Sequence, residues 1–332
     1  MRIAIDAMGG DYAPKEIVLG ALDGLAFLEP ADEIVLIGRE PAIREHLPGS
    51  ADSRIRIEHA ADVVEMDDIP VEALRQKKDS SISRMAKLGA EKKVDAVISA
   101  GNTGACVAAC QLKMRALPGV SRPGIAVVLP SFHGPVTICD VGANVEPKPH
   151  HLLEYAVMAT IYAETILHIR NPKVGLISIG SEEVKGKQIT KQARDLIKAD
   201  ARLNFVGNVE GRELLAGVVD VAICDGFVGN IVLKLTEGLS DGLFKTIEKE
   251  LAAEAPQLVE SFKPVVRSIW ARHDYSEYGG APLLGVDGVC IICHGSSDRR
   301  AIKNAVRVAR DYVRAQVNHI FETRLAQETA GA

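Results

Sequence analysis

The chain of 332 residues is 47% apolar and 25% charged, the composition of an ordinary globular protein with ample material for a core. Its formal net charge of −5 argues against a nucleic-acid-binding protein, because such proteins normally carry a basic excess. No apolar run approaches the roughly 20 residues that span a bilayer, and the first residues form a strand pattern rather than a signal peptide. We therefore expect a cytoplasmic protein whose six cysteines are free thiols.

Short apolar strands alternate with helical patterns along the whole chain. Strands are expected at 2–5, 34–37, 54–59, 94–98, 124–129, 135–140, 173–179, 203–206, 220–224 and 288–293. Helices are expected from Pro14, over 40–47, after Ser80 or Ser81, over 105–114, over 150–168, up to 199, from 231, and at the C-terminus. This alternation predicts an α/β fold with a doubly wound, mostly parallel sheet covered by helices on both faces. No linker or repeat divides the chain, so we expect one catalytic unit over 1–332.

Six turns that follow predicted strands combine glycine with Asp, Asn, Ser or Thr. They begin at Asp6, Ser99, Asp140, Gly180, Asp225 and His294. Because ligands of parallel sheets bind at the carboxyl ends of the strands, we expect the six turns to share one edge. Such a set of donors is typical of a polyanion or acyl-transfer site.

The turn Ser99-Ala100-Gly101-Asn102-Thr103-Gly104 is the first candidate site. Its glycines leave backbone amides uncovered, and Asn102 or Thr103 can cap the following helix. Amide donors at the positive end of a helix favour a phosphate or a developing oxyanion. A capped strand-to-helix connection without a ligand would look the same, and only the repetition of such turns favours a ligand.

Motifs for other chemistries are absent or incomplete. No G-x-G-x-x-G follows a strand, the stretch 180–187 has the wrong spacing and two glutamates for a phosphate loop, and G-x-S-x-G is missing. His294 stands at a strand end beside Ser296 and Ser297. It is either a catalytic imidazole or a structural histidine before a helix capped by Ser297 or Asp298, and the sequence favours neither.

The cysteines do not predict a metal site. Cys290 and Cys293 form a C-x-x-C in a predicted strand, where residues three apart face opposite sides and cannot share an ion. Cys106 and Cys110 lie one turn apart on a predicted helix beside alanines, so we interpret them as small packing residues.

Two helical patterns stand out towards the C-terminus. An apolar face with the only tryptophan predicts a helical projection within 238–276 that is a subunit interface, a membrane anchor or a core helix. The residues assigned to membrane or acyl-chain contact are Leu258, Phe262, Val266, Ile269 and Trp270. A basic stripe on the C-terminal helix is either a solvated face or a docking site for an acidic partner. Its members are Arg300, Lys303, Arg307, Arg310 and Arg314.

A series of these motifs occurs in a specific order over nearly the whole chain, although each is weak alone. The motifs are Asp6-Ala7-Met8-Gly9-Gly10-Asp11, Lys78-Asp79-Ser80-Ser81, Ser99-Ala100-Gly101-Asn102-Thr103-Gly104, Asp140-Val141-Gly142-Ala143-Asn144, Cys224-Asp225-Gly226-Phe227 with Gly229-Asn230, Tyr278-Gly279-Gly280-Ala281 and His294-Gly295-Ser296-Ser297-Asp298. Together they resemble the bacterial phosphate acyltransferase family, the acyl-carrier-protein:phosphate acyltransferases of phospholipid synthesis.

The resemblance implies a fold like isocitrate and isopropylmalate dehydrogenases and phosphotransacetylases, and a homodimer loosely associated with the inner face of the cell membrane. It implies transfer of a fatty acyl group from acyl carrier protein to inorganic phosphate, without a cofactor. The acyl phosphate would then pass to a membrane glycerol-3-phosphate acyltransferase. Two other functions stay open: a phosphotransacetylase acting on short acyl-coenzyme A, and a non-catalytic membrane scaffold for lipid-synthesis enzymes.

We hypothesise direct attack of phosphate on the thioester, because phosphate is already an anionic nucleophile that needs positioning and oxyanion stabilisation. The expected phosphate-binding residues are Ser99, Gly101, Asn102, Thr103, Gly104, Asn144, Ser296 and Ser297. His294 is expected to donate a proton to the leaving thiolate or to orient another group, with Asn102 and with Lys185 or Lys148 as further catalytic residues. Residues expected to order the loops are Asp6, Asp11, Asp225 and Asn230. The basic stripe is the expected docking site of the carrier protein.

Overall fold

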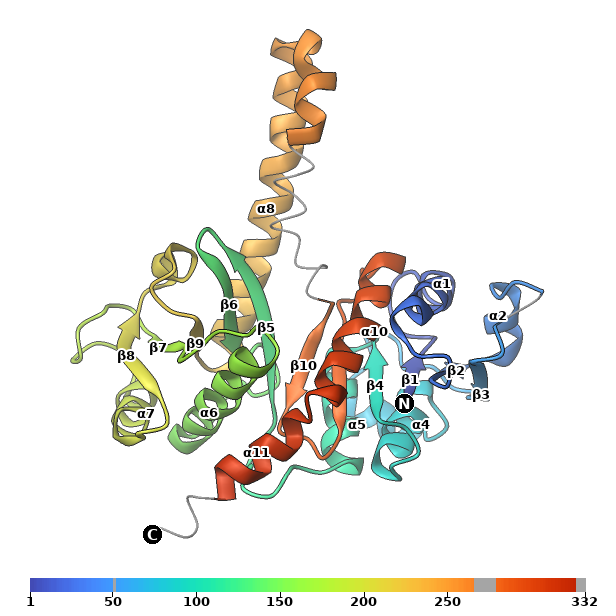
Figure 1. The fold of residues 1–332 in the computed structure, drawn as a ribbon, viewed down its shortest axis with the longest axis horizontal. Helices are drawn as coiled ribbons and strands as arrows, with labels where there is room; N and C mark the ends of the chain where they lie inside the picture. The colour runs from blue at the N-terminus through green and yellow to red at the C-terminus, as the bar shows by residue number, and fades with distance from the viewer. Residues whose placement is uncertain (50–51, 266–278, 327–332) are drawn as a thin grey trace.

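The computed structural model describes residues 1–49, 52–265 and 279–326, and its centre is one 11-stranded sheet in the order β3-β2-β1-β4-β11-β10-β5-β6-β9-β7-β8 (Figure 1). The strands are β1 (Arg2–Asp6), β2 (Glu33–Gly38), β3 (Ile55–His59), β4 (Ala96–Ser99), β5 (Gly124–Ser131), β6 (Gly134–Cys139), β7 (Lys173–Ile177), β8 (Asn204–Val209), β9 (Val221–Ile223), β10 (Ala281–Leu284) and β11 (Val289–Ile292).

Helices connect these strands. The α-helices are α1 (Lys15–Gly24), α2 (Glu40–Glu45), α3 (Pro70–Gln76), α4 (Ser81–Ala90), α5 (Thr103–Lys113), α6 (Pro149–Thr165), α7 (Gln188–Ala199), α8 (Gly226–Glu254), α10 (Arg299–Arg314) and α11 (Val317–Ala326). Short 3-10 helices are η1 (Leu25–Phe27), η2 (Gly211–Ala216) and η3 (Pro256–Leu258). Helices α3 and α11 and strand β10 were not expected as separate elements.

Both faces of the sheet are covered, as the alternation of elements predicts. In β1, Ile3 and Ile5 pack into the core that contains α1, α6 and α10, whereas Ala4 packs into the core that contains α4 and α5. Successive side chains of a strand point to opposite faces of the sheet, so the residues of β1 pack alternately into the cores on its two sides. The doubly wound α/β fold is confirmed.

The direction of the strands corrects one expectation. Seven of the ten pairings between described strands are parallel, but β10 pairs antiparallel with β11 and β5, and β5 pairs antiparallel with β6. The parallel set β3-β2-β1-β4-β11 therefore runs opposite to the parallel set β6-β9-β7-β8. The six polar turns do not share one edge: those after β1, β4 and β11 lie at one end of the strands, and those after β6, β7 and β9 at the other.

Helix α8 begins at Gly226, earlier than the expected residue 231. Asp225 caps it, because its carboxylate accepts a hydrogen bond from the Val228 N–H at 2.8 Å. A Cβ at Gly229 would lie 2.0 Å from the carbonyl oxygen of Asp140, which follows β6. The glycines that were interpreted as a turn therefore belong to the first turn of a helix and permit its close approach to β6.

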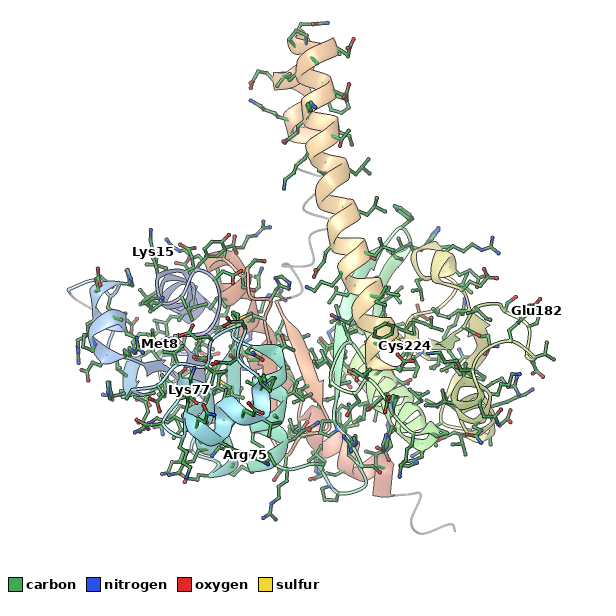
Figure 2. All side chains as sticks on the ribbon, turned by 180° about the vertical axis from the view of Figure 1, so that it is seen from behind. Met8, Lys15, Arg75, Lys77, Glu182 and Cys224 are labelled. Carbon is green, nitrogen blue, oxygen red and sulfur yellow. The ribbon has the colours of Figure 1, made fainter. Side chains whose placement is uncertain are left out.

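The rest of α8 forms a projection (Figure 1). The helix has 29 residues, which corresponds to about 43 Å at the usual rise. Seen from behind, its upper part stands clear of the sheet, with side chains extending into open space (Figure 2). The expected contact residues Leu258 and Phe262 are exposed beyond its end. Val266, Ile269, Trp270 and Tyr278 lie outside the described residues.

No helix in the described parts of the chain is both long enough and apolar enough to cross a membrane.

The packing of α1 against α10 generates a stability prediction. A Cβ at Gly20 would lie 2.6 Å from both the Arg299 carbonyl oxygen and the Ile302 Cβ. We expect Gly20→Ala to lower the free energy of unfolding by about 1–3 kcal/mol through overpacking. Gly242→Ala is the control, because an added Cβ on this open part of α8 meets nothing within 4 Å and alanine should stabilise the helix by up to about 1 kcal/mol. The midpoints of denaturant unfolding measure the stability of both variants. A Gly20→Ala protein as stable as the wild type would contradict the close packing of α1 against α10.

Candidate active site

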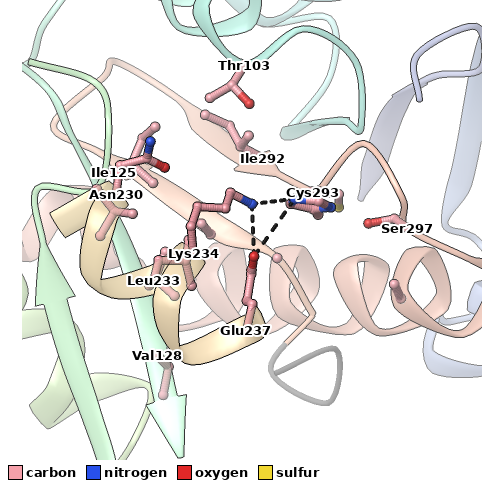
Figure 3. Close-up of a pocket in the computed structure, with 16 residues that line it drawn as sticks. Thr103, Ile125, Val128, Asn230, Leu233, Lys234, Glu237, Ile292, Cys293 and Ser297 are labelled. Atoms are coloured by element: carbon pink, nitrogen blue, oxygen red, sulfur yellow. Dashed lines mark hydrogen bonds and ion pairs between the residues drawn. The ribbon is translucent and has the colours of Figure 1, made fainter. Parts of the chain in front are cut away.

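A cleft lies between the first half of α8, strand β5 and the turn after β11. It encloses about 800 Å³, including its open mouth. One wall is apolar and consists of Ile125, Val127, Val128, Val141, Leu233 and Ile292. Polar side chains of the cleft are Thr103, Asn230, Lys234, Glu237, His294 and Ser297 (Figure 3). The cleft is therefore amphiphilic.

Helix α8 connects the two sets of turns. At its base, the Gly226 N–H donates to the Asn144 carbonyl at 2.8 Å, and Asn230 lies against Gly142, both from the turn after β6. Further along the helix, Lys234 and Glu237 reach the turn after β11. Residues from opposite ends of the sheet thus line one cleft.

Lys234 and Glu237 meet His294 at the polar centre of the cleft (Figure 3). The Lys234 ammonium contacts His294 Nε2 and donates to Glu237 Oε2 at 2.9 Å. Glu237 Oε2 lies 4.0 Å from His294 Nε2. His294 was expected from the sequence, whereas Lys234 and Glu237 were not, although their spacing of three places them on one helix face.

The environment of His294 keeps its imidazole neutral. Burial lowers the pKa of His294, and the neighbouring Lys234 charge lowers it further, while Glu237 opposes both. Ser296 holds the other nitrogen of the ring: its N–H donates to Nδ1 at 3.2 Å, and its hydroxyl oxygen lies 2.7 Å from the same atom. Of the two roles expected for His294, this arrangement favours orientation over proton donation.

The Ser99 turn is held against the turn after β1. Ser99 Oγ donates to Asp6 Oδ2 at 2.8 Å and accepts from the Gly101 N–H at 3.1 Å. A Cβ at Gly9 would lie 2.6 Å from the Gly101 nitrogen, so the two turns touch through their backbones. Burial raises the pKa of Asp6. The Ser99 hydroxyl is buried in this network and does not line the cleft.

The side chain of Asn102 also forms its hydrogen bonds within the protein. Its Oδ1 caps α5 by accepting from the Ala105 N–H at 3.0 Å. Its Nδ2 contacts three carbonyls of the loop at 65–68, at 3.0 to 3.3 Å. Thr103 and Gly104 are the first two residues of α5, ahead of the intrahelical bond from the Cys106 N–H to the Asn102 carbonyl. Their N–H groups therefore have no acceptor within the helix, and Thr103 lines the cleft.

Several of the other expected residues hold loops together. Asn144 Nδ2 donates to the Pro123 carbonyl at 2.7 Å. The buried carboxylate of Asp140 accepts from the N–H groups of Ile125 and Asn144, yet burial raises its pKa to about 6. The Asp11 N–H donates to the Gly295 carbonyl at 2.8 Å, which ties the turn after β1 to the turn after β11.

The expected lysines and the basic stripe lie elsewhere. Lys185 is exposed in the loop between β7 and α7 and is not among the residues that line the cleft. In the stripe on α10, Lys303 and Arg310 lie 5.4 and 5.6 Å from the centre of the Phe27 ring. Arg314 pairs with Glu29 at 2.9 Å. These three cations already have partners near the end of α1.

Comparison with known proteins identifies the family. A family model described as "Fatty acid synthesis protein" matches residues 1–320. A phosphate acyltransferase of Desulfitobacterium hafniense is 48% identical, with 99% of each chain covered. That of Brevibacillus brevis is 46% identical, covering 100% of this chain and 99% of its own. This chain belongs to the phosphate acyltransferase family. It is therefore an acyltransferase, as the turn motifs predict.

Solved structures show the same fold at much lower identity. A phosphotransacetylase from Streptococcus pyogenes has a TM-score of 0.62 at 18% identity, covering 96% of this chain and 94% of that one. A 4-hydroxythreonine-4-phosphate dehydrogenase from Klebsiella pneumoniae has a TM-score of 0.53 at 12% identity, covering 94% of this chain and 99% of that one. The expected phosphotransacetylase-like fold is confirmed for this family member.

The enzyme also brings together three cysteines that were not expected to share a site. Cys290 and Cys293 do face opposite sides of β11, since they belong to different cores. However, α5 covers the face of Cys290, so that its sulfur lies beside those of Cys106 and Cys110. Strand alternation could exclude one pair but could not show which helix packs on that face.

Replacing either charged neighbour of His294 should shift the pKa of its imidazole, and the two replacements should shift it in opposite directions. Lys234→Met removes the positive charge that lowers the pKa of His294, so that pKa should rise. Glu237→Gln removes a charge that raises it, so that pKa should fall. Titration of histidine ring signals by nuclear magnetic resonance measures both shifts, with His294→Ala to assign the signal. Shifts in the same direction would contradict the observed arrangement.

Proposed function

We propose that this enzyme transfers a fatty acyl group from acyl-[acyl carrier protein] to inorganic phosphate and so provides acyl phosphate for phospholipid synthesis. The observation that carries the proposal is the two-part character of the cleft. A cation with hydroxyl and amide donors stands at one end, beside an apolar wall. An acyl phosphate has the same two parts, an anionic head and a hydrocarbon chain. The full-length relatives named phosphate acyltransferases support phosphate as the acceptor.

In the proposed site, the Lys234 ammonium binds phosphate together with Ser297 and the N–H groups of Thr103 and Gly104. His294 and Glu237 hold the ammonium in place. Asn102, Ser99 and Asp6 act one step away by fixing the turn and the start of α5. Charge of this kind, fixed before the reaction, stabilises the oxyanion of the thioester without reorganisation.

The reaction balances without an outside proton donor. A phosphate oxygen of HPO4²⁻ attacks the thioester carbon, the carbonyl oxygen becomes the oxyanion, and collapse breaks the carbon–sulfur bond. The proton that phosphate loses equals the proton that the carrier thiolate gains. Lys234 can give a proton to the thiolate and recover one from phosphate, which leaves His294 as the orienting group.

The apolar wall is the proposed place for the first part of the acyl chain. Val127 and Val128 of β5 and Leu233 of α8 line the same cleft as Lys234. Burial of hydrocarbon there would stabilise the bound substrate by about 0.8 kcal/mol for each methylene removed from water. This term favours long acyl groups over acetyl groups.

The test of the proposed function is phosphate-dependent release of thiol from palmitoyl-[acyl carrier protein], with acetyl-coenzyme A in parallel. We expect turnover of the carrier substrate and a loss of about 10²- to 10³-fold in kcat for Lys234→Met. Lys234→Arg keeps the charge and should retain more activity, and the surface variant Lys113→Met should match the wild type. Turnover of acetyl-coenzyme A alone would indicate a phosphotransacetylase, and turnover of neither substrate would favour a scaffold.

For the acidic carrier protein, we propose docking on the α10 stripe near the cleft. Its support is position, since Ala301 lines the cleft and Arg300 and Lys303 flank it in sequence. Arg300→Glu should raise the KM for the acylated carrier without changing kcat. An unchanged KM, equal to that of the control Lys113→Glu, would count against this surface.

For the projection, we propose contact with the inner face of the membrane, where a membrane glycerol-3-phosphate acyltransferase would receive the product, in a homodimeric enzyme. Support comes from exposed apolar side chains at one end: Leu258, Phe262 and Val265 are 46%, 41% and 47% exposed. The acyl chain remains the other occupant considered for this face.

Leu258→Asp combined with Phe262→Asp should weaken binding to anionic liposomes roughly tenfold or more, because each change removes apolar burial. The control is Leu112→Asp, an equally drastic change at an exposed leucine of α5. Co-sedimentation measures binding, and analytical ultracentrifugation gives the oligomeric state. Equal binding by the wild type and the double variant would rule out membrane contact through these residues.

A further inference from the structure

Three buried thiols form a cluster behind the proposed phosphate turn. Cys106 and Cys110 come from the first turns of α5, and Cys290 comes from β11. Cys290 Sγ lies 3.9 Å from Cys106 Sγ and 3.5 Å from Cys110 Sγ, and all three sulfurs lie within 4.8 Å of one another. Each cysteine is at most 1% exposed.

The geometry is that of a three-sulfur ligand set. An ion bonded to each sulfur at about 2.3 Å places the sulfurs about 3.4 to 3.8 Å apart, depending on the bond angles. The observed separations need only a small adjustment to reach that spacing. The cysteines on α5 are one turn apart and face the strand, so side-chain rotation can direct both sulfurs to one point.

Charge decides which ion fits. A divalent ion on three thiolates leaves one net negative charge, and a monovalent ion leaves two, in an apolar core close to the Asp6 carboxyl. Zinc usually binds four ligands. Among the described His, Cys, Asp and Glu residues, only three lie close enough together here to bind one ion. A trivalent, three-coordinate metalloid gives a neutral complex and needs no further ligand.

We propose that Cys106, Cys110 and Cys290 form a binding site for a trivalent thiophilic metalloid, with arsenite as its probe. The reaction is a ligand exchange without redox change: As(OH)3 and three thiols give As(SR)3 and three water molecules. Three arsenic–sulfur bonds replace three arsenic–oxygen bonds, and each thiol proton leaves in a water molecule. The product joins the start of α5 to the centre of the sheet.

The experiment uses the native, reduced, full-length protein and sodium arsenite. Mass spectrometry under native conditions should show uptake of one arsenic atom with loss of three hydrogens. Arsenic K-edge absorption should show three sulfur neighbours and no oxygen. Absence of uptake by the native protein, or mixed sulfur and oxygen coordination, would overturn the proposal, and neither readout depends on a variant.

Variants identify the ligands. Each single replacement of a cluster cysteine by alanine should weaken arsenite binding about a hundredfold, because only two of the three arsenic–sulfur bonds can then form within the site. The variants are Cys106→Ala, Cys110→Ala and Cys290→Ala. Cys139→Ala removes another fully buried thiol outside the cluster and should bind like the wild type. Arsenite should raise the melting temperature of the wild type and of this control, but not of the three cluster variants. Equal affinity in a folded Cys290→Ala protein would refute the assignment.

Discussion

The contact between Lys234 and His294 is the interaction on which the account of the active site depends. It joins α8, which starts at the carboxyl end of one set of parallel strands, to the turn at the carboxyl end of the opposite set. Residues from turns at opposite ends of the sheet therefore line one cleft. Glu237 balances the ammonium and His294 contacts it, so a cation stands in a largely apolar cleft. In the proposed site, that cation binds the phosphate.

Most polar side chains of the turns act on the protein itself. Ser99, Asn102 and Asn144 each have hydrogen-bond partners that hold one loop to another. Buried polar groups without partners are costly, so a rigid turn requires this internal network. In the proposed site, the groups that face the ligand are then few: backbone N–H groups at the start of α5, a hydroxyl, and one charge from α8. Positioning residues outnumber contacting residues in such a site.

The sequence predicted the layers of the fold well, because strand and helix periodicity are local properties. Apolar strands such as β4 and caps such as Ser80 of α4 and Asn102 of α5 were recognisable from a few residues. Strand direction was not recognised. Because β10 pairs antiparallel on both sides, β5 runs in the same direction as β11. The assumption of one shared edge failed at the antiparallel pair of β5 and β6, which turns β6 and the strands beyond it the other way.

Residues of the candidate site were predictable where they lie in turns and not where they lie on a helix. His294 and Thr103 were found because they follow strands. Lys234 and Glu237 look like an ordinary solvated pair on α8, and only the packing of α8 across β5 gives them a function. In the same way, a list of cysteines shows spacing along one element, but the meeting of Cys290 with α5 is a tertiary contact.

The most direct test of the central claim is a double-mutant cycle on the phosphate KM with Lys234→Met, His294→Ala and the double variant. If His294 acts by orienting Lys234, the double variant should be little worse than Lys234→Met, with a coupling energy of about 1 kcal/mol or more. Losses that add independently would contradict the account, because the two residues would then act on the substrate separately.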